Sequence, residues 1–437
     1  MPVRGKFAVR NGNPTPRKPN SFPTNRPPMK PMSILRAAFC LGLMASSAPA
    51  APAVPFGSRP VPYTAGTLKP STSNAVMDQV IRNYFAKWKA AYLVSVGHSG
   101  WKAVRSPDAS HPFVAEAQGY GLEILALLAG ADASAQSDFD AVLKYVLAHP
   151  SRINGHLMAA EQNAEGVSVN GGDSATDGDL SIAYALLLAD KQWGGNGKYR
   201  RLALARIAAI RQSEMNPVTK LPLLGDWVSP SDSFYFGTRP SDFMLDHFRA
   251  FREATGDVFW DGVATACQNL ISYLQAHYSP STGLVPDFVV ATNTASPHPA
   301  PANYLESRND GAYSWNATRV PWRLGADAAL FGNSTSRSQA RAMSDWLRVN
   351  ANGQPAKIRT GYTLAGKSLG SGGEPAFFST IGPAAALGTD QAWLDALWTA
   401  MATEAAKDKI ADYYGASLLL QGMIVVSGNY WSPVTTP

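Results

Sequence analysis

Apolar residues recur at helical spacing along most of the chain from about residue 74 onward. In the first such segment Val76, Met77, Val80, Ile81, Tyr84, Phe85, Trp88 and Tyr92 follow i, i+3, i+4 spacing on one face. The same pattern predicts helices over about 76–92, 116–128, 139–147, 180–193, 199–215, 242–254, 259–278, 319–330, 336–349, 391–404 and 412–426. No convincing run alternates apolar and polar residues as a strand would. The expected fold class is therefore all-α.

These helical segments follow one another with no break in composition, which indicates a single repeating helical domain over residues 51–437. Three of the connecting loops are long and combine Asp, Asn and Gly with Trp or Tyr, namely 162–179, 224–242 and 279–316. Long polar loops on a rigid frame are where binding chemistry usually lies. We expect the functional site there.

Residues 1–50 are typical of a leader rather than of the folded domain. After Met29 come Lys30 and Arg36, a short apolar run over 37–45, and small residues ending at Ala50. This is the layout of a secretory signal peptide, with a start at Met29 and cleavage near Ala50. The apolar run is too short to span a bilayer. We expect a secreted or periplasmic protein without an integral membrane segment.

The formal charge of +6 comes from this leader. Residues 1–50 hold eight of the 38 Lys and Arg and no Asp or Glu, so the remainder carries 30 basic against 32 acidic side chains. A nucleic-acid partner is therefore not indicated. Only Cys267 remains beyond the leader, which excludes an intrachain disulfide or a cysteine metal cluster. We expect no metal, no cofactor and a monomer.

Glu116 is the first candidate for chemistry. It opens an apolar helix next to Gly119 and Gly121, so its carboxylate would lie at the positive end of the helix dipole, where glycines let a ligand approach. An ordinary first-turn glutamate is the alternative interpretation.

A second cluster places Asp173, Asp177 and Asp179 in a glycine-rich turn before another helix. A calcium loop of the helix–loop–helix kind is excluded, because Ala175 and Tyr184 occupy two positions that need acidic ligands. Simple helix capping remains an alternative function of these side chains.

The third cluster lies within residues 306–323, at the end of a long loop. It combines two acids, Glu306 and Asp310, with Tyr313 and Trp315 and with the arginine pair Arg319 and Arg323. Sugar sites need this mixture, because aromatic rings stack on the C–H faces of sugars while hydroxyls need polar partners.

One motif points elsewhere. Residues 361–368 read GYTLAGKS and match the phosphate-loop pattern letter for letter. That pattern is meaningful only between a buried strand and a helix, whereas residues 354–360 are polar and 369–375 are rich in glycine. Nucleotide binding is not supported. The chain also contains no H-E-x-x-H helix.

Taken together, these stretches resemble glycoside hydrolase family 8, which includes endoglucanases, lichenases, chitosanases and some xylan-active enzymes. The strongest element is residues 175–193, ATDGDLSIAYALLLADKQW, which resembles the family signature. Residues 116–121, 239–244 and 316–323 resemble further family motifs in the same order. The resemblance implies an (α/α)₆ toroid with a cleft across one end.

It also implies roles for individual residues. Glu116 matches the family's general acid. Asp177 matches the acid that binds the sugar at the cleavage point, and Arg319 matches the arginine beneath the subsite for that sugar. In one branch of the family the base is an aspartate, but Asn316 occupies that position and cannot accept a proton. The chain resembles instead the branch whose base is a glutamate on the preceding loop. Glu306 is the favoured base and Asp310 the alternative.

The resulting hypothesis is an inverting endo-glycosidase that cuts a β-linked polysaccharide, with Glu116 as acid and Glu306 as base. Asn316 is expected to hydrogen-bond to the substrate or the attacking water. The expected substrate is β-1,4 or β-1,3-1,4 glucan. Chitosan or xylan, a glycan-binding protein that has lost its base, and a polysaccharide lyase are the alternatives. The expected aromatic contacts to substrate are Tyr120, Tyr313, Trp101, Trp227, Trp315 and Trp322. For each of the four tryptophans, a place in the core is an equal alternative.

Overall fold

The helices fall into two groups that differ in how much of their surface is buried. In α9 (Ser334–Asn350) the buried positions are Ser336, Gln339, Ala340, Met343, Ser344 and Leu347, one stripe with helical spacing. In α13 (Tyr413–Val426) every residue is buried. A helix with one apolar face lies at the surface of a fold, and a helix that is apolar all round lies inside it. The two groups therefore form an outer and an inner layer.

The structure is a computed structural model in which residues 51–434 are described. The leader predicted for residues 1–50 lies outside them. The outer helices are α1 (Asn74–Tyr92), α3 (Ala135–Ala148), α5 (Lys198–Ser213), α7 (Phe259–His277), α9 and α12 (Gln391–Ala406). The inner helices are α2 (Ala115–Leu127), α4 (Thr176–Trp193), α6 (Leu245–Thr255), α8 (Val320–Phe331), α11 (Ile381–Ala385), preceded by α10 (Pro375–Phe378), and α13.

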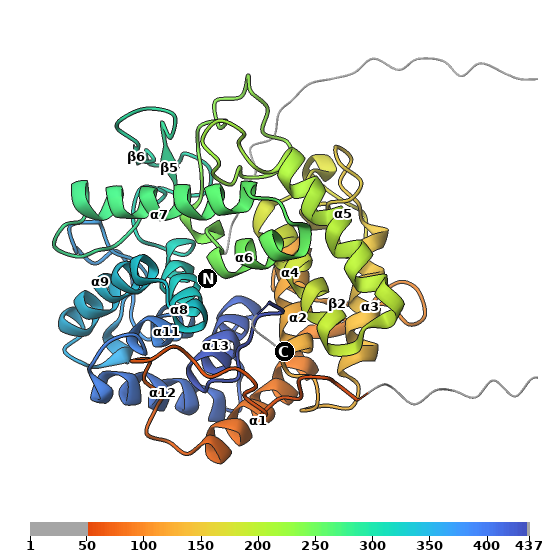
Figure 1. The fold of residues 1–437 in the computed structure, drawn as a ribbon, viewed down its shortest axis with the longest axis horizontal. Helices are drawn as coiled ribbons and strands as arrows, with labels where there is room; N and C mark the ends of the chain where they lie inside the picture. The colour runs from red at the N-terminus through yellow and green to blue at the C-terminus, as the bar shows by residue number, and fades with distance from the viewer. Residues whose placement is uncertain (1–50, 435–437) are drawn as a thin grey trace, which may run out of the picture.

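The inner helices close into a ring. Helix α2 contacts α4, α4 contacts α6, and the sequence of neighbours continues through α8, α11 and α13 back to α2 (Figure 1). Each inner helix also contacts an outer helix next to it in the chain, as in the pairs α2 with α3 and α8 with α9. This double ring of helices is the (α/α)₆ toroid expected from the sequence, and the prediction of an all-α fold is confirmed.

Short segments complete the fold between the helices. Three two-stranded antiparallel ribbons are formed by β1 (Leu93–Ser95) with β2 (Lys102–Val104), β3 (Phe113–Val114) with β4 (Glu161–Gln162), and β5 (Val289–Val290) with β6 (His298–Pro299). The 3-10 turns are η1 (Asn170–Gly172), η2 (Gly195–Gly197), η3 (Pro240–Asp242), η4 (Ala317–Arg319) and η5 (Pro355–Lys357). Strands of two or three residues are too short to give an alternating pattern, which is why the sequence shows none.

The segment before α1 closes one end of the toroid. The amide of Phe56 donates to the carbonyl of Ala129 after α2, and the amide of Thr64 donates to Ala329 in the last turn of α8. The Tyr63 hydroxyl donates to Val425 at the end of α13. The last carbonyls of a helix have no partner within it, and this segment provides partners for several of them. The carboxyl ends of the inner helices are thereby covered.

Candidate active site

The amino ends of the inner helices, at the opposite end of the toroid, bring the predicted acids together. Glu116 lies in the first turn of α2, directly after β3, and Asp177 lies in the first turn of α4. Arg319 ends η4, where α8 begins. Tyr413 is the first residue of α13. Because inner helices of a double ring run in the same direction, first-turn residues far apart in sequence meet at one end.

Glu116 is held by two hydrogen bonds and remains partly open. Arg319 Nη1 donates to its Oε2 at 3.2 Å, and the Tyr413 hydroxyl donates to its Oε1 at 3.3 Å. Its side chain keeps 18% exposure. Burial raises the pKa of Glu116 to about 7, against the opposing charge of Arg319 and with the support of Asp177. Glu116 can therefore carry a proton close to neutral pH.

Asp177 lies between two guanidinium groups. Its Oδ2 accepts from Arg319 Nη1 at 3.0 Å and pairs with Arg239 Nη2 at 3.0 Å. Burial alone would raise the pKa of Asp177, but Arg239 and Arg319 outweigh it and lower that pKa to about 2. Asp177 is therefore ionised at any ordinary pH. Its side chain is only 4% exposed.

Glu306 approaches the same cluster from the loop before η4. Asn316 Nδ2 donates to Glu306 Oε2 at 2.7 Å, and Arg239 Nη1 lies 3.7 Å from Oε1. The side chain is 29% exposed, which is more than Glu116. Burial raises the pKa of Glu306, while Arg239 and the Asn316 hydrogen bond oppose the rise. Both of the proposed catalytic carboxyls are thus open to solvent beside a buried group of partners.

Arg319 connects the two carboxyls. Besides Glu116 and Asp177, its Nη1 donates to the Tyr120 hydroxyl at 3.2 Å. Its Nη2 donates to Asn316 Oδ1 at 2.8 Å and to the Ser241 hydroxyl at 2.9 Å. A continuous path therefore runs from Glu116 through Arg319 and Asn316 to Glu306. The guanidinium itself is buried, so it holds the surrounding groups in place.

Asp310, the alternative candidate for the base, has a different environment from Glu306. It is completely buried. Its carboxylate accepts the backbone amides of Leu305, Glu306 and Ser307 at 2.7, 3.0 and 2.8 Å. Both oxygens are therefore engaged within the loop, whereas a base must reach a water next to the substrate.

Two of the tyrosines predicted to contact substrate are buried, so a direct contact of their rings with substrate stays a prediction. Tyr313 has no exposed surface, and its ring packs near Tyr362 and Phe377. Tyr120 is 1% exposed and contacts Arg319 instead.

The predicted tryptophans divide in the same way. Trp322 is 1% exposed and packs edge-on against Tyr120, so it belongs to the core. Trp315 is half-buried beside Asn316, and its ring packs on Phe377. Trp227 and Trp101 are also half-buried, with rings against Phe234 and His98 respectively. Of the six aromatic residues predicted to contact substrate, Trp315, Trp227 and Trp101 retain exposed surface that a sugar could cover.

Sequence reasoning gave no role to three residues of the cluster. Arg239 pairs with Asp177 and Asp242, and lies beside Glu306. Ser241 contacts Arg319, and Tyr413 contacts Glu116. The signal for Tyr413 is its place in the first turn of a helix, directly after a capping Asp412, because Glu116 also lies in the first turn of its helix, α2.

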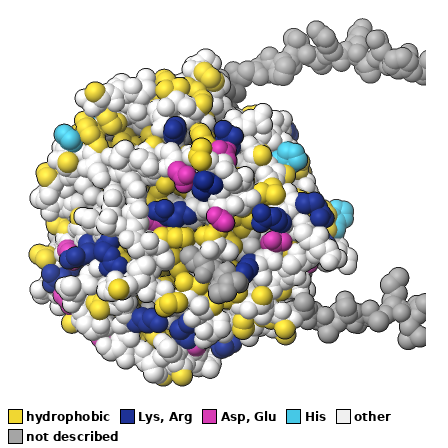
Figure 2. Space-filling view, in the orientation of Figure 1, with side chains coloured by type: hydrophobic (Ala, Val, Ile, Leu, Met, Phe, Trp, Pro, Cys, Tyr) yellow, Lys and Arg dark blue, Asp and Glu magenta, His cyan; other side chains and the backbone are white. Residues whose placement is uncertain are grey.

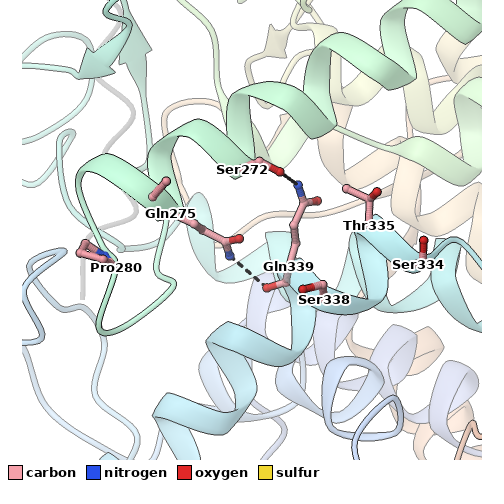
Figure 3. A pocket seen from close by; sticks show the side chains of 8 residues that line it. Ser272, Gln275, Pro280, Ser334, Thr335, Ser338 and Gln339 are labelled. Carbon is pink, nitrogen blue, oxygen red and sulfur yellow. Dashed lines mark hydrogen bonds between the residues drawn. The ribbon is translucent and has the colours of Figure 1, made fainter.

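A pocket away from these carboxyls lies on the outer ring between α7 and α9 (Figure 3). All eight residues that line it are uncharged. Gln339 Nε2 donates to the Ser272 hydroxyl at 2.9 Å, and Gln275 Nε2 donates to the Gln339 carbonyl at 3.0 Å. These amides link the two helices to each other, and the pocket has no acid or base.

The described residues show no further indication of metal or membrane chemistry. Within residues 51–434, no group of three or more His, Cys, Asp or Glu is arranged to hold a metal ion. No helix of this part of the chain has the length and apolar character needed to cross a bilayer. On the face shown in Figure 2, basic and acidic side chains lie side by side across the middle.

Comparisons with known proteins match nearly the whole described chain. A sequence model described as "Glycosyl hydrolases family 8" matches residues 64–428. A beta-glucanase of Niallia circulans is 40% identical over 400 residues, covering 90% of this chain and 96% of the relative. An endoglucanase of Bacillus sp. (strain KSM-330) is 37% identical over 389 residues, covering 84% and 80%.

Solved structures show the same fold. The apo structure of a beta-1,3-1,4-glucanase from Paenibacillus sp. X4 has a TM-score of 0.83 and 41% identity, covering 87% of this chain and 100% of that one. Rex8A from Paenibacillus barcinonensis, in complex with xylose, has a TM-score of 0.68 over 84% and 97% of the two chains. At 17% identity the second likeness shows the fold alone.

Proposed function

The chain belongs to glycoside hydrolase family 8, and we propose from this and from its active-site geometry that it cleaves β-glucan chains internally with inversion of configuration. The substrate proposal is supported by two relatives at about 40% identity, which are described as a beta-glucanase and a beta-1,3-1,4-glucanase. We propose mixed-linkage β-1,3-1,4 glucan as the first choice of substrate and β-1,4 glucan as the second.

The observation that carries the assignment of residues is the pair of partly exposed carboxyls, Glu116 and Glu306, joined through Arg319 and Asn316. In the proposed mechanism Glu116 donates its proton to the glycosidic oxygen as the bond to the anomeric carbon breaks. Glu306 accepts a proton from the water that attacks the same carbon from the opposite face. One attack from the opposite face inverts the anomeric centre.

The remaining groups hold this arrangement. Asp177 stays ionised between Arg239 and Arg319, so it can accept a hydrogen bond from a sugar hydroxyl without competing for the proton of Glu116. Asn316 donates to Glu306 and keeps one of its carboxylate oxygens in a fixed direction. An amide cannot accept the proton of the water, which supports Glu306 rather than residue 316 as the base.

The test is release of reducing ends from barley β-glucan, carboxymethylcellulose, chitosan and xylan by the wild type, Glu116→Gln and Glu306→Gln. We expect cleavage of barley β-glucan and a loss of at least about 10³-fold in kcat for each variant. The control is Glu253→Gln, because Glu253 is exposed on α6, and we expect it to match the wild type.

NMR of the first product would show the inverted anomer. Cleavage of chitosan or xylan alone would contradict the glucan assignment and leave the family activity standing. If Glu306→Gln kept full activity, Glu306 would not be the base.

We also propose that the protein is exported to the periplasm or the medium, with residues 1–50 as its leader, and that it acts as a monomer. The export proposal rests on the charged, apolar and small-residue segments that end at Ala50.

A further inference from the structure

The loop that carries Glu306 is folded around one buried carboxylate. Asp310 Oδ2 accepts the amides of Leu305 and Glu306, and Asp310 Oδ1 accepts both the amide and the hydroxyl of Ser307. The amide of Asn303 donates to the Ser307 carbonyl at 2.8 Å and closes the same turn. Three consecutive peptide units, including that of Glu306, thus converge on a single side chain.

Asp310 is in turn fixed to the body of the protein. Its carbonyl accepts the amide of Phe288 at 2.8 Å, and its side chain has no exposed surface. Hydrogen bonds to an ionised acceptor are shorter and stronger than those between neutral groups, and solvent does not compete with buried ones. The carboxylate therefore determines where the backbone of Glu306 lies relative to η4 and Asn316.

We propose that Asp310 is a positioning residue for the reaction, which holds Glu306 at the distance from substrate that the attacking water requires. This inference rests on the proposed function, because it takes Glu306 to be the base. Glu306 lies on a loop without regular structure, and the Asn316 bond fixes only the end of its side chain. Without the Asp310 contacts the backbone of that loop would lose its fixed position.

The Asp310→Asn substitution tests this because of how the bonds are divided between the two oxygens. An amide has one oxygen and one NH₂ group, and NH₂ cannot accept from a backbone amide. The variant must therefore lose either the bonds from the backbone amides of Leu305 and Glu306 or the bond from the backbone amide of Ser307. The shape of the side chain is otherwise kept, so the fold has the best chance of surviving.

The negative charge of Asp310 also affects the pKa of Glu306. The groups that face Glu306 are Arg239, Arg319 and Asn316, which favour its carboxylate, and Asp310 and Asp287, which are acidic. Burial is the main cause of the raised pKa of Glu306, and the charge of Asp310 adds to it. The Asp310→Asn substitution removes that charge, so the pKa of Glu306 should fall and the acidic limb of kcat/KM should move to lower pH.

The experiment compares wild type, Asp310→Asn and Asp327→Asn on barley β-glucan. Asp327, on α8, is an equally buried carboxylate, and it pairs with Arg249 and accepts a hydrogen bond from Ser336. We expect Asp310→Asn to lower kcat by about 10- to 100-fold, as for a displaced catalytic group, with KM within about threefold of wild type. We expect only Asp310→Asn to move the acidic limb. An unchanged kcat in Asp310→Asn would overturn the proposal. So would a fall in its kcat without any movement of the acidic limb of kcat/KM, which is the pattern expected of a merely structural change such as Asp327→Asn.

Azide separates this proposal from the proposed function. In a variant without a base, azide can attack the anomeric carbon directly: the C–N bond forms, the C–O bond breaks, and the leaving oxygen takes the proton of Glu116. We expect azide to restore turnover to Glu306→Ala and not to Asp310→Ala. Rescue of Asp310→Ala alone would make Asp310 the base and overturn both assignments. Rescue of Glu306→Ala together with wild-type kinetics in Asp310→Asn would overturn only the positioning role.

Discussion

At the scale of single residues, burial and charge move the pKa values of Glu116 and Asp177 in opposite directions although both contact Arg319. Burial dominates for Glu116 and raises its pKa to about 7. For Asp177 the second guanidinium, Arg239, tips the balance and the pKa falls to about 2. Two neighbouring acids with such different pKa values can hold different protonation states at one pH. A protonated general acid and an ionised residue that binds the sugar require this.

This difference predicts the basic limb of the pH profile. Glu116 must be protonated to act, so kcat/KM should fall as pH rises through about 7. The Tyr413 hydroxyl donates to Glu116 and stabilises its carboxylate. Tyr413→Phe should therefore raise the pKa of Glu116 and move the basic limb to higher pH, as measured by kcat/KM between pH 5 and 9. Tyr63→Phe, which removes a tyrosine hydroxyl at the other end of the toroid, should leave the limb in place. A limb that moves to lower pH in Tyr413→Phe would contradict the assignment.

The sequence identified acids more reliably than aromatic rings. Glu116, Asp177, Arg319 and Asn316 meet in one cluster, because a polar side chain at the start of an apolar helix must reach solvent or a charged partner. Tyr313 is expected to contact substrate and Trp322 is a candidate for either the substrate or the core, and both are buried. An aromatic ring packs equally well in the core or against a sugar, so the residue type alone does not show whether the ring faces the core or the substrate.

At the scale of elements, α2 and α4 approach closely through glycines beside the site. A Cβ on Gly178 would lie 2.6 Å from the Cβ of Ala115 and 3.0 Å from the amide of Glu116. A Cβ on Gly119 would lie 2.7 Å from the Cβ of Ser181. Both distances are below contact, so the helices can pack this tightly only because these residues are glycine. The position of Glu116 relative to Asp177 follows from this packing.

We therefore expect Gly178→Ala to impair both catalysis and stability. The added methyl group would push the first turn of α2 away from α4 and displace Glu116 from its partners. Overpacking of this kind costs about 1–3 kcal/mol of folding free energy, while a shift of about 1 Å at a catalytic group can cost roughly 100-fold in rate. Urea unfolding and kcat on β-glucan measure the two effects. Gly155→Ala is the control, since a Cβ there meets no atom within 4 Å and no effect is expected. Full activity in Gly178→Ala would show that the acid tolerates the shift.

The helical elements themselves were predictable to within a few residues. All eleven expected helices are present, because each has either an apolar stripe or a long apolar run. The element that the sequence did not predict is the fifth inner position, where α10 and α11 hold four and five residues. Pro375 begins α10 and Pro383 lies within α11, and helices this short have no measurable period. The phosphate-loop match at residues 361–368 lies in an irregular loop, as its flanking residues indicated.

At the scale of the whole molecule, the toroid contains several acids whose pKa is raised by burial. Asp173, Asp179 and Asp242 reach about 6, chiefly through burial, and Glu116 reaches about 7. Burial also raises the pKa of Glu214 well above its ordinary value. Such a group binds its proton more tightly in the folded state than in the unfolded state. Its contribution to stability is therefore present at low pH and is lost as pH rises through the interval between the two pKa values.

The carboxyls with lowered pKa act in the opposite direction, but over a different range. Asp177, at about 2, contributes stability above the unfolded pKa of 3.8 and loses it only as pH falls towards 2. Above about pH 5 that contribution is complete, so only the groups with raised pKa still change with pH. The free energy of unfolding should then decline between pH 5 and pH 8.

Glu214→Gln tests this decline at one position. The Ser174 hydroxyl donates to Glu214 Oε1 at 2.6 Å, while Oε2 is buried without a hydrogen-bond partner, so a neutral amide can replace the protonated acid. Above the unfolded pKa of 4.5, each unit of pH should cost the wild type up to about 1.4 kcal/mol at this site until the folded pKa is reached. The variant carries no proton to lose, so its urea midpoint should fall less than that of the wild type between pH 5 and pH 8. The exposed Glu253→Gln should follow the wild type. Parallel curves for wild type and Glu214→Gln would mean that Glu214 is ionised in the folded toroid, with a partner other than Ser174 to stabilise its charge.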